Sequence, residues 1–125
     1  MSIVYDAGAL IAAESNDRRI WAEHRARLEL GIEPVTAAPV VAQVSRSPRQ
    51  VQLRRFLRGC RLVALTPDDA HRIGTLLAAT GSSDVVDAHV ALVASDERTD
   101  IWTSDPEDLR SLAQHTDHPA RIQQI

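Results

Sequence analysis

The chain of 125 residues contains no lysine, and all 14 of its basic residues other than histidine are arginine. The absence of a catalytic or phosphate-binding lysine disfavours P-loop nucleotidases, response-regulator receivers, haloacid-dehalogenase-type phosphatases, restriction-type nucleases and Schiff-base enzymes. Arginine does not replace lysine freely in these proteins, because its guanidinium group is a rigid planar fork that stays protonated.

Cysteine, aromatic residues and long apolar runs are also scarce. The single cysteine, Cys60, excludes an internal disulfide and a cysteine-rich zinc site, and it has no convincing catalytic partner. Aromatic residues make up 3% of the chain, so Val, Leu, Ile and Ala must build the core. No apolar stretch approaches the roughly 20 residues that span a bilayer, and no basic region opens a signal peptide. We therefore expect a cytoplasmic protein.

Charge is distributed unevenly along a chain whose net charge is -3. Many arginines lie between Arg18 and Arg61, whereas acidic residues gather between Asp84 and Asp108. Two interpretations follow. Either one part of the surface attracts phosphate while another holds cations, or these residues are solvated faces of helices.

Short β-rich runs alternate with amphipathic helices, which is typical of a single α/β domain, residues 1–125, with a mostly parallel sheet. The strands are expected at Ser2–Tyr5, 33–36, 61–65 and 100–103, with a final edge strand at 121–125. The helices are expected at Ala7–Glu14, 17–30, 37–46, 47–58, Pro67–Thr80 and Val85–Glu97, with a last one beginning after Asp105. Pro39 and Pro48 are expected to open the helices at 37–46 and 47–58.

Three aspartates occupy informative positions in this pattern. Asp6 directly follows the first strand, and Asp105 follows the strand at 100–103. Because ligands collect at the carboxyl ends of parallel strands, both side chains are expected to face one crevice. Asp87 lies within the most apolar helix, where a carboxylate is costly unless it is paired or binds a cation. Asp84, three residues earlier, shares its helical face.

Clustered carboxylates repel one another, and a hard cation bound through oxygen, Mg²⁺ or Mn²⁺, is the usual resolution. A second interpretation remains open for three of them, because Asp6, Asp84 and Asp105 each also fit a helix N-cap. Asp87 has no evident capping role. The four acids together therefore favour a metal site.

Three motifs resemble those of the PIN-domain family. IVYDAGALIAA is similar to its N-terminal motif, DAHVALVA to its Asp-Ala-x-Ile-Ala-x-x-Ala helix, and WTSDPEDL to its terminal Thr-x-Asp motif. The resemblance covers the whole chain and implies a three-layer α/β/α sandwich with a short, mostly parallel central sheet. It also implies that Asp6, Asp87 and Asp105 are the catalytic, metal-binding acids and that the Thr103 hydroxyl supports the site.

The chain departs from the family at one acidic position. Where the family usually has a glutamate, in the helix after the second strand, this sequence has Gln43. Glutamine keeps an oxygen donor but loses a negative charge, which weakens cation affinity; alternatively, Gln43 simply points into solvent. Asp84 is the main candidate to supply the missing charge, and Asp108 is a weaker one.

The small bacterial members of this family are mostly VapC-type toxins of toxin–antitoxin pairs. The resemblance thus implies an Mg²⁺- or Mn²⁺-dependent endoribonuclease, a homodimer, and a small VapB-like antitoxin that inserts a basic side chain into the site. Apolar positions at 37–57 would form its docking groove. Arg46, Arg49, Arg54 and Arg55 would hold RNA phosphates, unless they line a solvated helix.

Two other interpretations remain. The first is a catalytically weakened PIN module that binds RNA or a protein without efficient cleavage, which Gln43 favours. The second is an unrelated flavodoxin-like domain, but the chain lacks a Gly-rich phosphate loop. The five histidines show no zinc spacing, and His89 is expected to be a hydrogen-bonded core residue.

Overall fold

A five-stranded parallel sheet in the order β3-β2-β1-β4-β5 forms the centre of the computed structural model, which describes residues 1–125. Each strand pairs with its neighbours in parallel register, as in Val4 opposite Val35 of β2 and Ile101 of β4. The strands are β1 (Ser2–Tyr5), β2 (Glu33–Ala37), β3 (Arg61–Val63), β4 (Ile101–Thr103) and β5 (Ile122–Gln124). The predicted parallel sheet is confirmed.

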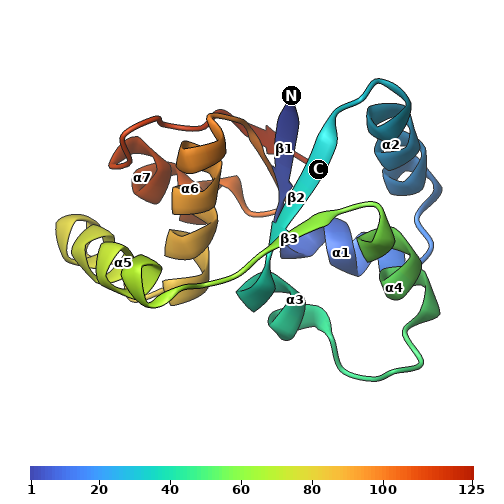
Figure 1. Cartoon of the computed structure of the whole chain (residues 1–125), viewed down its shortest axis with the longest axis horizontal. Helices are drawn as coiled ribbons and strands as arrows, with labels where there is room; N and C mark the ends of the chain where they lie inside the picture. The colour runs from blue at the N-terminus through green and yellow to red at the C-terminus, as the bar shows by residue number, and fades with distance from the viewer.

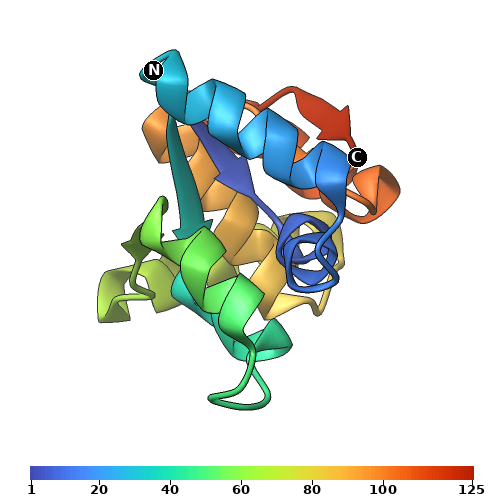
Figure 2. The same ribbon diagram turned by 90° about the vertical axis from the view of Figure 1, so that its right-hand side faces the viewer.

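Seven helices cover the two faces of the sheet (Figure 1). They are α1 (Ala7–Glu14), α2 (Arg18–Glu29), α3 (Ala38–Val44), α4 (Val51–Arg58), α5 (Pro67–Thr80), α6 (Val85–Glu97) and α7 (Pro106–Gln114). The helices α5, α6 and α7 lie on one side of the sheet and α1, α2 and α4 on the other (Figures 1 and 2). The result is the three-layer α/β/α sandwich that the motifs implied.

Local sequence signals account for several helix ends. The Asp17 side chain accepts hydrogen bonds from the N–H groups of Arg19 and Ile20 and so caps α2. Thr66 and Asp69 form a reciprocal capping box at the start of α5. Gly81, with a φ of 72°, ends the same helix in the left-handed conformation that glycine adopts without strain.

Some expected boundaries differ from the structure, and one acid lies at a different place in its helix. Pro48 does not open a helix: it lies in a turn, and α4 begins only at Val51. The strand β3 ends at Val63 rather than at residue 65, because β2 pairs with it only as far as Ala37. Asp87 is the third residue of α6 and lies in its first turn, not in the middle of the helix.

The core contains all four aromatic residues of the chain, gathered beneath α2 and α4. Tyr5 contacts Phe56 and Trp102 at ring-centroid distances of 5.5 and 5.1 Å, and Trp21 packs edge-on against Phe56 at 5.1 Å. His24 is buried with them, and its Nδ1 is 3.0 Å from the Tyr5 hydroxyl. Burial lowers the pKa of His24 to about 4, so the ring is neutral at physiological pH.

No single helix is long and apolar enough to cross a membrane; α5 and α6 reach that length together only across a bend of 106°.

Candidate metal centre

Carboxylates from three separate parts of the chain line one small pocket at the carboxyl ends of β1 and β4. Asp6 follows β1, Asp105 follows β4, and Asp84 and Asp87 belong to the start of α6. The pocket measures about 230 Å³, and its polar lining includes Asp6, Asp84, Asp87, Asp105, Asp108 and Gln43. Asp6, Asp84 and Asp105 are the N-cap residues of α1, α6 and α7. Three helix N-termini therefore meet here, and their dipoles favour negative charge.

Asp6 is held by the strand on the other side of the pocket. Its side chain is buried, and the Thr103 hydroxyl donates a hydrogen bond of 2.8 Å to its Oδ2 atom. The same Thr103 oxygen accepts from the Asp105 N–H at 3.0 Å. Neither Asp6 nor Asp105 makes a side-chain capping bond to its own helix. Both residues therefore occupy N-cap positions without capping through their side chains, and Thr103 connects the two acids.

A close approach between α1 and the segment after β4 shapes one wall. A Cβ atom at Gly8 would lie 2.4 Å from the Ser104 Oγ atom and 2.8 Å from the Ser104 Cβ atom. Only glycine lets the first turn of α1 pack this tightly against the residue that precedes Asp105. Sequence reasoning did not single out Gly8 or Ser104, and their proximity to Asp6 and Asp105 along the chain was the only available signal.

Asp84 has the capping role that the sequence left open. Its Oδ1 atom accepts a hydrogen bond of 2.9 Å from the Asp87 N–H, so it caps α6 and also lines the pocket. Asp87 lies beside it, half-buried. Burial, together with the charges of Asp84, Asp6 and Asp108, raises the pKa of Asp87 to about 7. Without a cation, the negative charge in this pocket is thus incompletely compensated.

Gln43 and Asp108 complete the lining. Gln43 projects from α3 into the same pocket, which is the position that the family resemblance gave to a glutamate. Gln43 is also exposed to solvent, so the same position is compatible with the alternative of a solvated helix residue. Asp108, the weaker candidate at the sequence level, lies in the first turn of α7 and contributes to the raised pKa of Asp87.

All the polar side chains of the pocket offer oxygen, the donor that Mg²⁺ and Mn²⁺ prefer. As the side chains stand, however, no three carboxylates or histidines are close enough together to hold one ion. Asp84 uses its Oδ1 atom to accept from the Asp87 N–H. The residues therefore fit a divalent cation by the chemistry of their oxygen donors.

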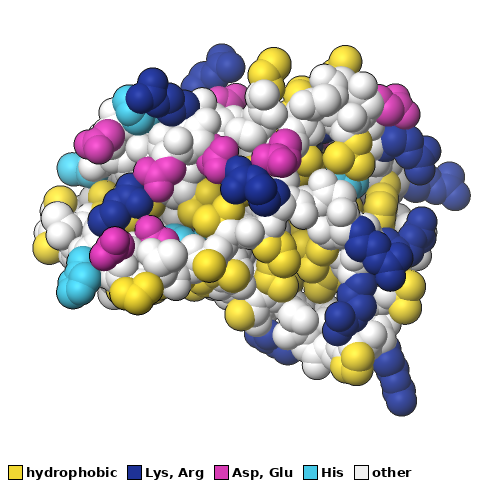
Figure 3. Space-filling model, viewed as in Figure 1, with side chains coloured by type: hydrophobic (Ala, Val, Ile, Leu, Met, Phe, Trp, Pro, Cys, Tyr) yellow, Lys and Arg dark blue, Asp and Glu magenta, His cyan; other side chains and the backbone are white.

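The arginines named from the sequence do not reach this pocket. Arg46 and Arg49 lie between α3 and α4, Arg54 and Arg55 lie on α4, and all four are exposed. None of them lines the acidic pocket. Figure 3 shows basic side chains gathered on the side of the molecule that carries α2 and α4, whereas most acidic side chains in view lie on the other side.

A larger hollow of about 700 Å³ lies at the amino ends of the strands, where Met1, Arg27 and Asp100 contribute to its lining. Much of its charge is already paired, since Arg61 contacts Glu33 and Glu97, and Arg121 lies 3.5 Å from Asp100. The acidic pocket therefore has the more concentrated uncompensated charge, although its volume is smaller.

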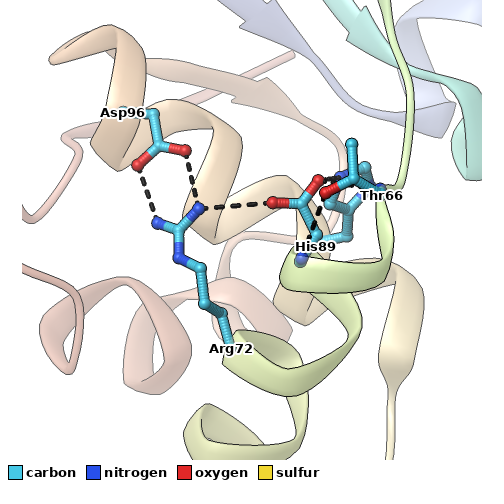
Figure 4. A network of polar contacts seen from close by, with 5 residues as sticks. Thr66, Arg72, His89 and Asp96 are labelled. Atoms are coloured by element: carbon cyan, nitrogen blue, oxygen red, sulfur yellow. Dashed lines mark hydrogen bonds and ion pairs between the residues drawn. The ribbon is translucent and has the colours of Figure 1, made fainter.

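His89 belongs to a separate polar network between α5 and α6 (Figure 4). Arg72 donates two hydrogen bonds to Asp96, at 2.9 and 2.7 Å, and a third to Asp69 at 3.3 Å. His89 is buried, its Nε2 atom lies 3.8 Å from an Asp69 oxygen, and neither ring nitrogen has a hydrogen-bond partner. His89 therefore lies in the core as expected, but neither ring nitrogen forms the expected hydrogen bond. Burial lowers its pKa, so the ring is neutral and the network is structural.

The chain matches no protein-family model and no curated protein. Its structure is similar to a chain in the crystal structure of VapBC2 from Rickettsia felis bound to a DNA fragment from their promoter. The match has a TM-score of 0.69 and 13% sequence identity, and it covers 100% of this chain and 99% of the other. The resemblance that the three motifs indicated is thus confirmed at the level of the fold: over its full length, this chain has the PIN-like α/β fold of that VapBC2 chain.

Proposed function

We propose that this protein is a metal-dependent ribonuclease that hydrolyses RNA phosphodiester bonds, and that it acts as the toxin of a type II toxin–antitoxin pair in the cytoplasm. The observation that carries the proposal is the convergence of five aspartates on one pocket at the carboxyl ends of β1 and β4. The full-length structural similarity to a VapBC2 chain also supports the proposal. The acidic pocket lies in the same PIN-like fold that the three sequence motifs indicated.

Asp6, Asp87 and Asp105 would hold Mg²⁺ or Mn²⁺, and Asp84 would add a fourth carboxylate. A bound cation of this kind lowers the pKa of a water molecule and stabilises negative charge on a scissile phosphate. The raised pKa of Asp87 supports this assignment, because a bound cation offsets both the burial and the neighbouring negative charges that raise it.

The remaining residues of the pocket would orient these acids. Thr103 fixes the Asp6 carboxylate and the Asp105 backbone through its single hydroxyl. A carboxylate held this way keeps one oxygen occupied and leaves the other to face the pocket. Asp87 would release its own proton to solvent when a cation binds, and its carboxylate would then accept the proton of the attacking water.

The proposed partners are RNA as substrate, a second copy of the chain, and a small VapB-like antitoxin. Exposed apolar side chains near the pocket and on α4 are consistent with a protein partner, since Ile11 is 56% and Val51 59% exposed. A basic side chain of the antitoxin would be attracted to the five aspartates and would compete there with the cation.

Cleavage of a labelled single-stranded RNA by the purified protein tests the proposal. We expect cleavage in Mg²⁺ or Mn²⁺, none in EDTA, and a loss of at least about a hundredfold in Asp87→Asn. Asp117→Asn is the matched control, because this exposed aspartate lies outside the pocket and makes no ion pair. Full activity in Asp87→Asn, with both variants folded, would sink the assignment.

The presence of Gln43 in the pocket supports a second candidate, a weakened module that binds RNA or a protein without efficient cleavage. The Gln43→Glu variant separates the two. If wild type is active and Gln43→Glu changes the rate only modestly, the nuclease assignment stands. If wild type is inactive and Gln43→Glu restores metal-dependent cleavage, the weakened module is correct.

A further inference from the structure

A second pocket, between α2 and α4, is lined by basic and amide side chains without any carboxylate. It measures about 270 Å³, and its lining includes Asn16, Arg18, Trp21, Arg25, Gln52 and Arg55. Arg18, Trp21 and Arg25 follow one another at helical spacing and so share one face of α2. Gln52 and Arg55, three residues apart, present the facing side of α4.

Part of this pocket is held in place before any ligand arrives. The Trp21 indole N–H donates a hydrogen bond of 3.0 Å to the Ala13 carbonyl, and the ring packs against Phe56. Arg55 donates to the Gln52 side chain at 3.0 Å, and its Cζ atom lies 5.5 Å from the centroid of the Trp21 ring. Preorganised guanidinium groups lose less conformational entropy when they bind an anion.

The arginines of this pocket have no acidic partners. Five of the 14 arginines form ion pairs with carboxylates, namely Arg27, Arg61, Arg72, Arg110 and Arg121. Arg18, Arg25 and Arg55 are not among them. In a chain with a net charge of -3, three unpaired cations around one hollow form a local field that favours a polyanion.

The helix α1 links this pocket to the acidic one. Gly8 and Ile11 of this helix line the acidic pocket, and Asn16, just beyond its end, lines the basic pocket. The eight residues of α1 span about 12 Å at the rise of an α-helix. A polyanion that reaches the aspartates is therefore within a short distance of the arginines.

We propose that Arg18, Arg25 and Arg55 bind backbone phosphates of single-stranded RNA on the strand that extends away from the acidic pocket. This inference rests on the proposed function, and it adds a binding site to it. Five aspartates repel phosphates, so affinity for the strand must come from positive groups elsewhere. The amides of Asn16 and Gln52 add hydrogen-bond donors for phosphate or ribose oxygens. Only Trp21 and Ala22 of the lining residues are hydrophobic, whereas three are arginines, which favours a polyanion such as RNA over a protein helix.

The test is the salt dependence of RNA binding, measured by fluorescence anisotropy with a labelled oligouridylate in EDTA. All proteins carry Asp87→Asn, so that binding is read without cleavage. One variant adds Arg18→Gln, Arg25→Gln and Arg55→Gln. Its matched control adds Arg98→Gln, Arg110→Gln and Arg121→Gln, which removes the same charge away from the basic pocket. Circular dichroism checks the fold of each protein.

We expect the pocket variant to lose affinity roughly tenfold or more at low salt. The slope of log K against log salt should fall by about 2, since each single-strand phosphate contact contributes about 0.7. The control should lose less than about threefold, with little change in slope. Equal effects in the two variants, no effect in either, or no binding by the parent protein would each overturn the inference. If both variants lose affinity for RNA equally, an acidic protein segment becomes the expected ligand of the unpaired arginines.

This outcome is distinguishable from failure of the proposed function. The pocket inference is read from binding in EDTA, whereas the nuclease is read from cleavage in Mn²⁺. A protein that binds RNA through the pocket but never cleaves it contradicts only the nuclease, and the reverse result contradicts only the pocket.

Discussion

Removing the charge of Asp87 should stabilise this protein when no divalent cation is present. The carboxyl group is half-buried at the start of α6 and faces Asp84, Asp6 and Asp108. These surroundings raise the pKa of Asp87 to about 7, whereas an aspartate in an unfolded chain titrates near about 3.9. Asp87→Asn keeps the size and hydrogen-bonding capacity of the side chain and removes the charge.

The sign and size of the effect follow from proton linkage. Because the folded protein binds this proton more tightly than the unfolded chain, Asp87 favours folding fully below pH ~4 and loses that contribution as pH rises through about 7. The gap between the two pKa values corresponds to at most about 4 kcal/mol. Solvent in the open pocket screens the repulsion, so we expect Asp87→Asn to raise the free energy of unfolding by roughly 2 kcal/mol at pH 8. The variant should have little effect near pH 4.

Thermal unfolding followed by circular dichroism measures this difference. In EDTA at pH 8, the Tm of Asp87→Asn should exceed that of wild type by roughly 6–10 °C. Mg²⁺ or Mn²⁺ should then raise the Tm of wild type, because a ligand at a hundred times its Kd adds about 2.7 kcal/mol. The cation should stabilise the variant much less. Asp117→Asn, outside the pocket, should follow wild type in every condition.

Two results would refute this reasoning. If Asp87→Asn is no more stable than wild type at pH 8, the carboxylates of the pocket do not repel one another as inferred. If Mg²⁺ and Mn²⁺ raise the Tm of the variant as much as that of wild type, Asp87 does not contribute to a cation site.

Three further predictions concern residues in and beyond the pocket. Thr103→Val should lower the free energy of unfolding by about 1–3 kcal/mol and weaken the Mn²⁺-induced rise in Tm, because it leaves the Asp6 carboxylate and the Asp105 N–H without their shared partner. A variant as stable as wild type, with the same response to Mn²⁺, would contradict this prediction. Gly8→Ala should lower the free energy of unfolding by about 1–3 kcal/mol, since its Cβ would meet Ser104. An unchanged urea midpoint would show that Ser104 moves aside without a loss of stability. Burial raises the pKa of Cys60 to about 12, so iodoacetamide should modify this thiol at pH 8 only as the protein unfolds. Rapid modification of the native protein, detected by mass spectrometry, would contradict this prediction.

The local elements of the fold were predictable because their signals are local. The bounds of α1, α5 and α6 match the predicted ranges. Side-chain caps mark the starts of α5 and α6, and Gly81 marks the end of α5. Pro48 shows the limit of such signals. Proline is compatible with the first turn of a helix and with an ordinary turn, and here packing of Leu53 and Phe56 starts the helix later.

The acidic pocket was predictable in outline for a different reason. A residue that directly follows a parallel strand must lie at the carboxyl edge of the sheet, so Asp6 and Asp105 were expected to share a crevice. The competing capping role of each acid could not be decided from the sequence, because an aspartate before a helix satisfies both interpretations. The bond from Thr103 to Asp6 joins residues 97 positions apart and decides the question.

By itself, the sequence determined the order of the elements, the parallel sheet and the identity of the acids, since each depends on local propensity and periodicity. Only the tertiary structure decided which groups meet. The placement of β1 between β2 and β4 brings Asp6 to Thr103, and the packing of α2 against α4 gathers Arg18, Arg25 and Arg55 around one pocket. These encounters depend on burying apolar faces far apart in the chain, and no local signal specifies which faces will pack together.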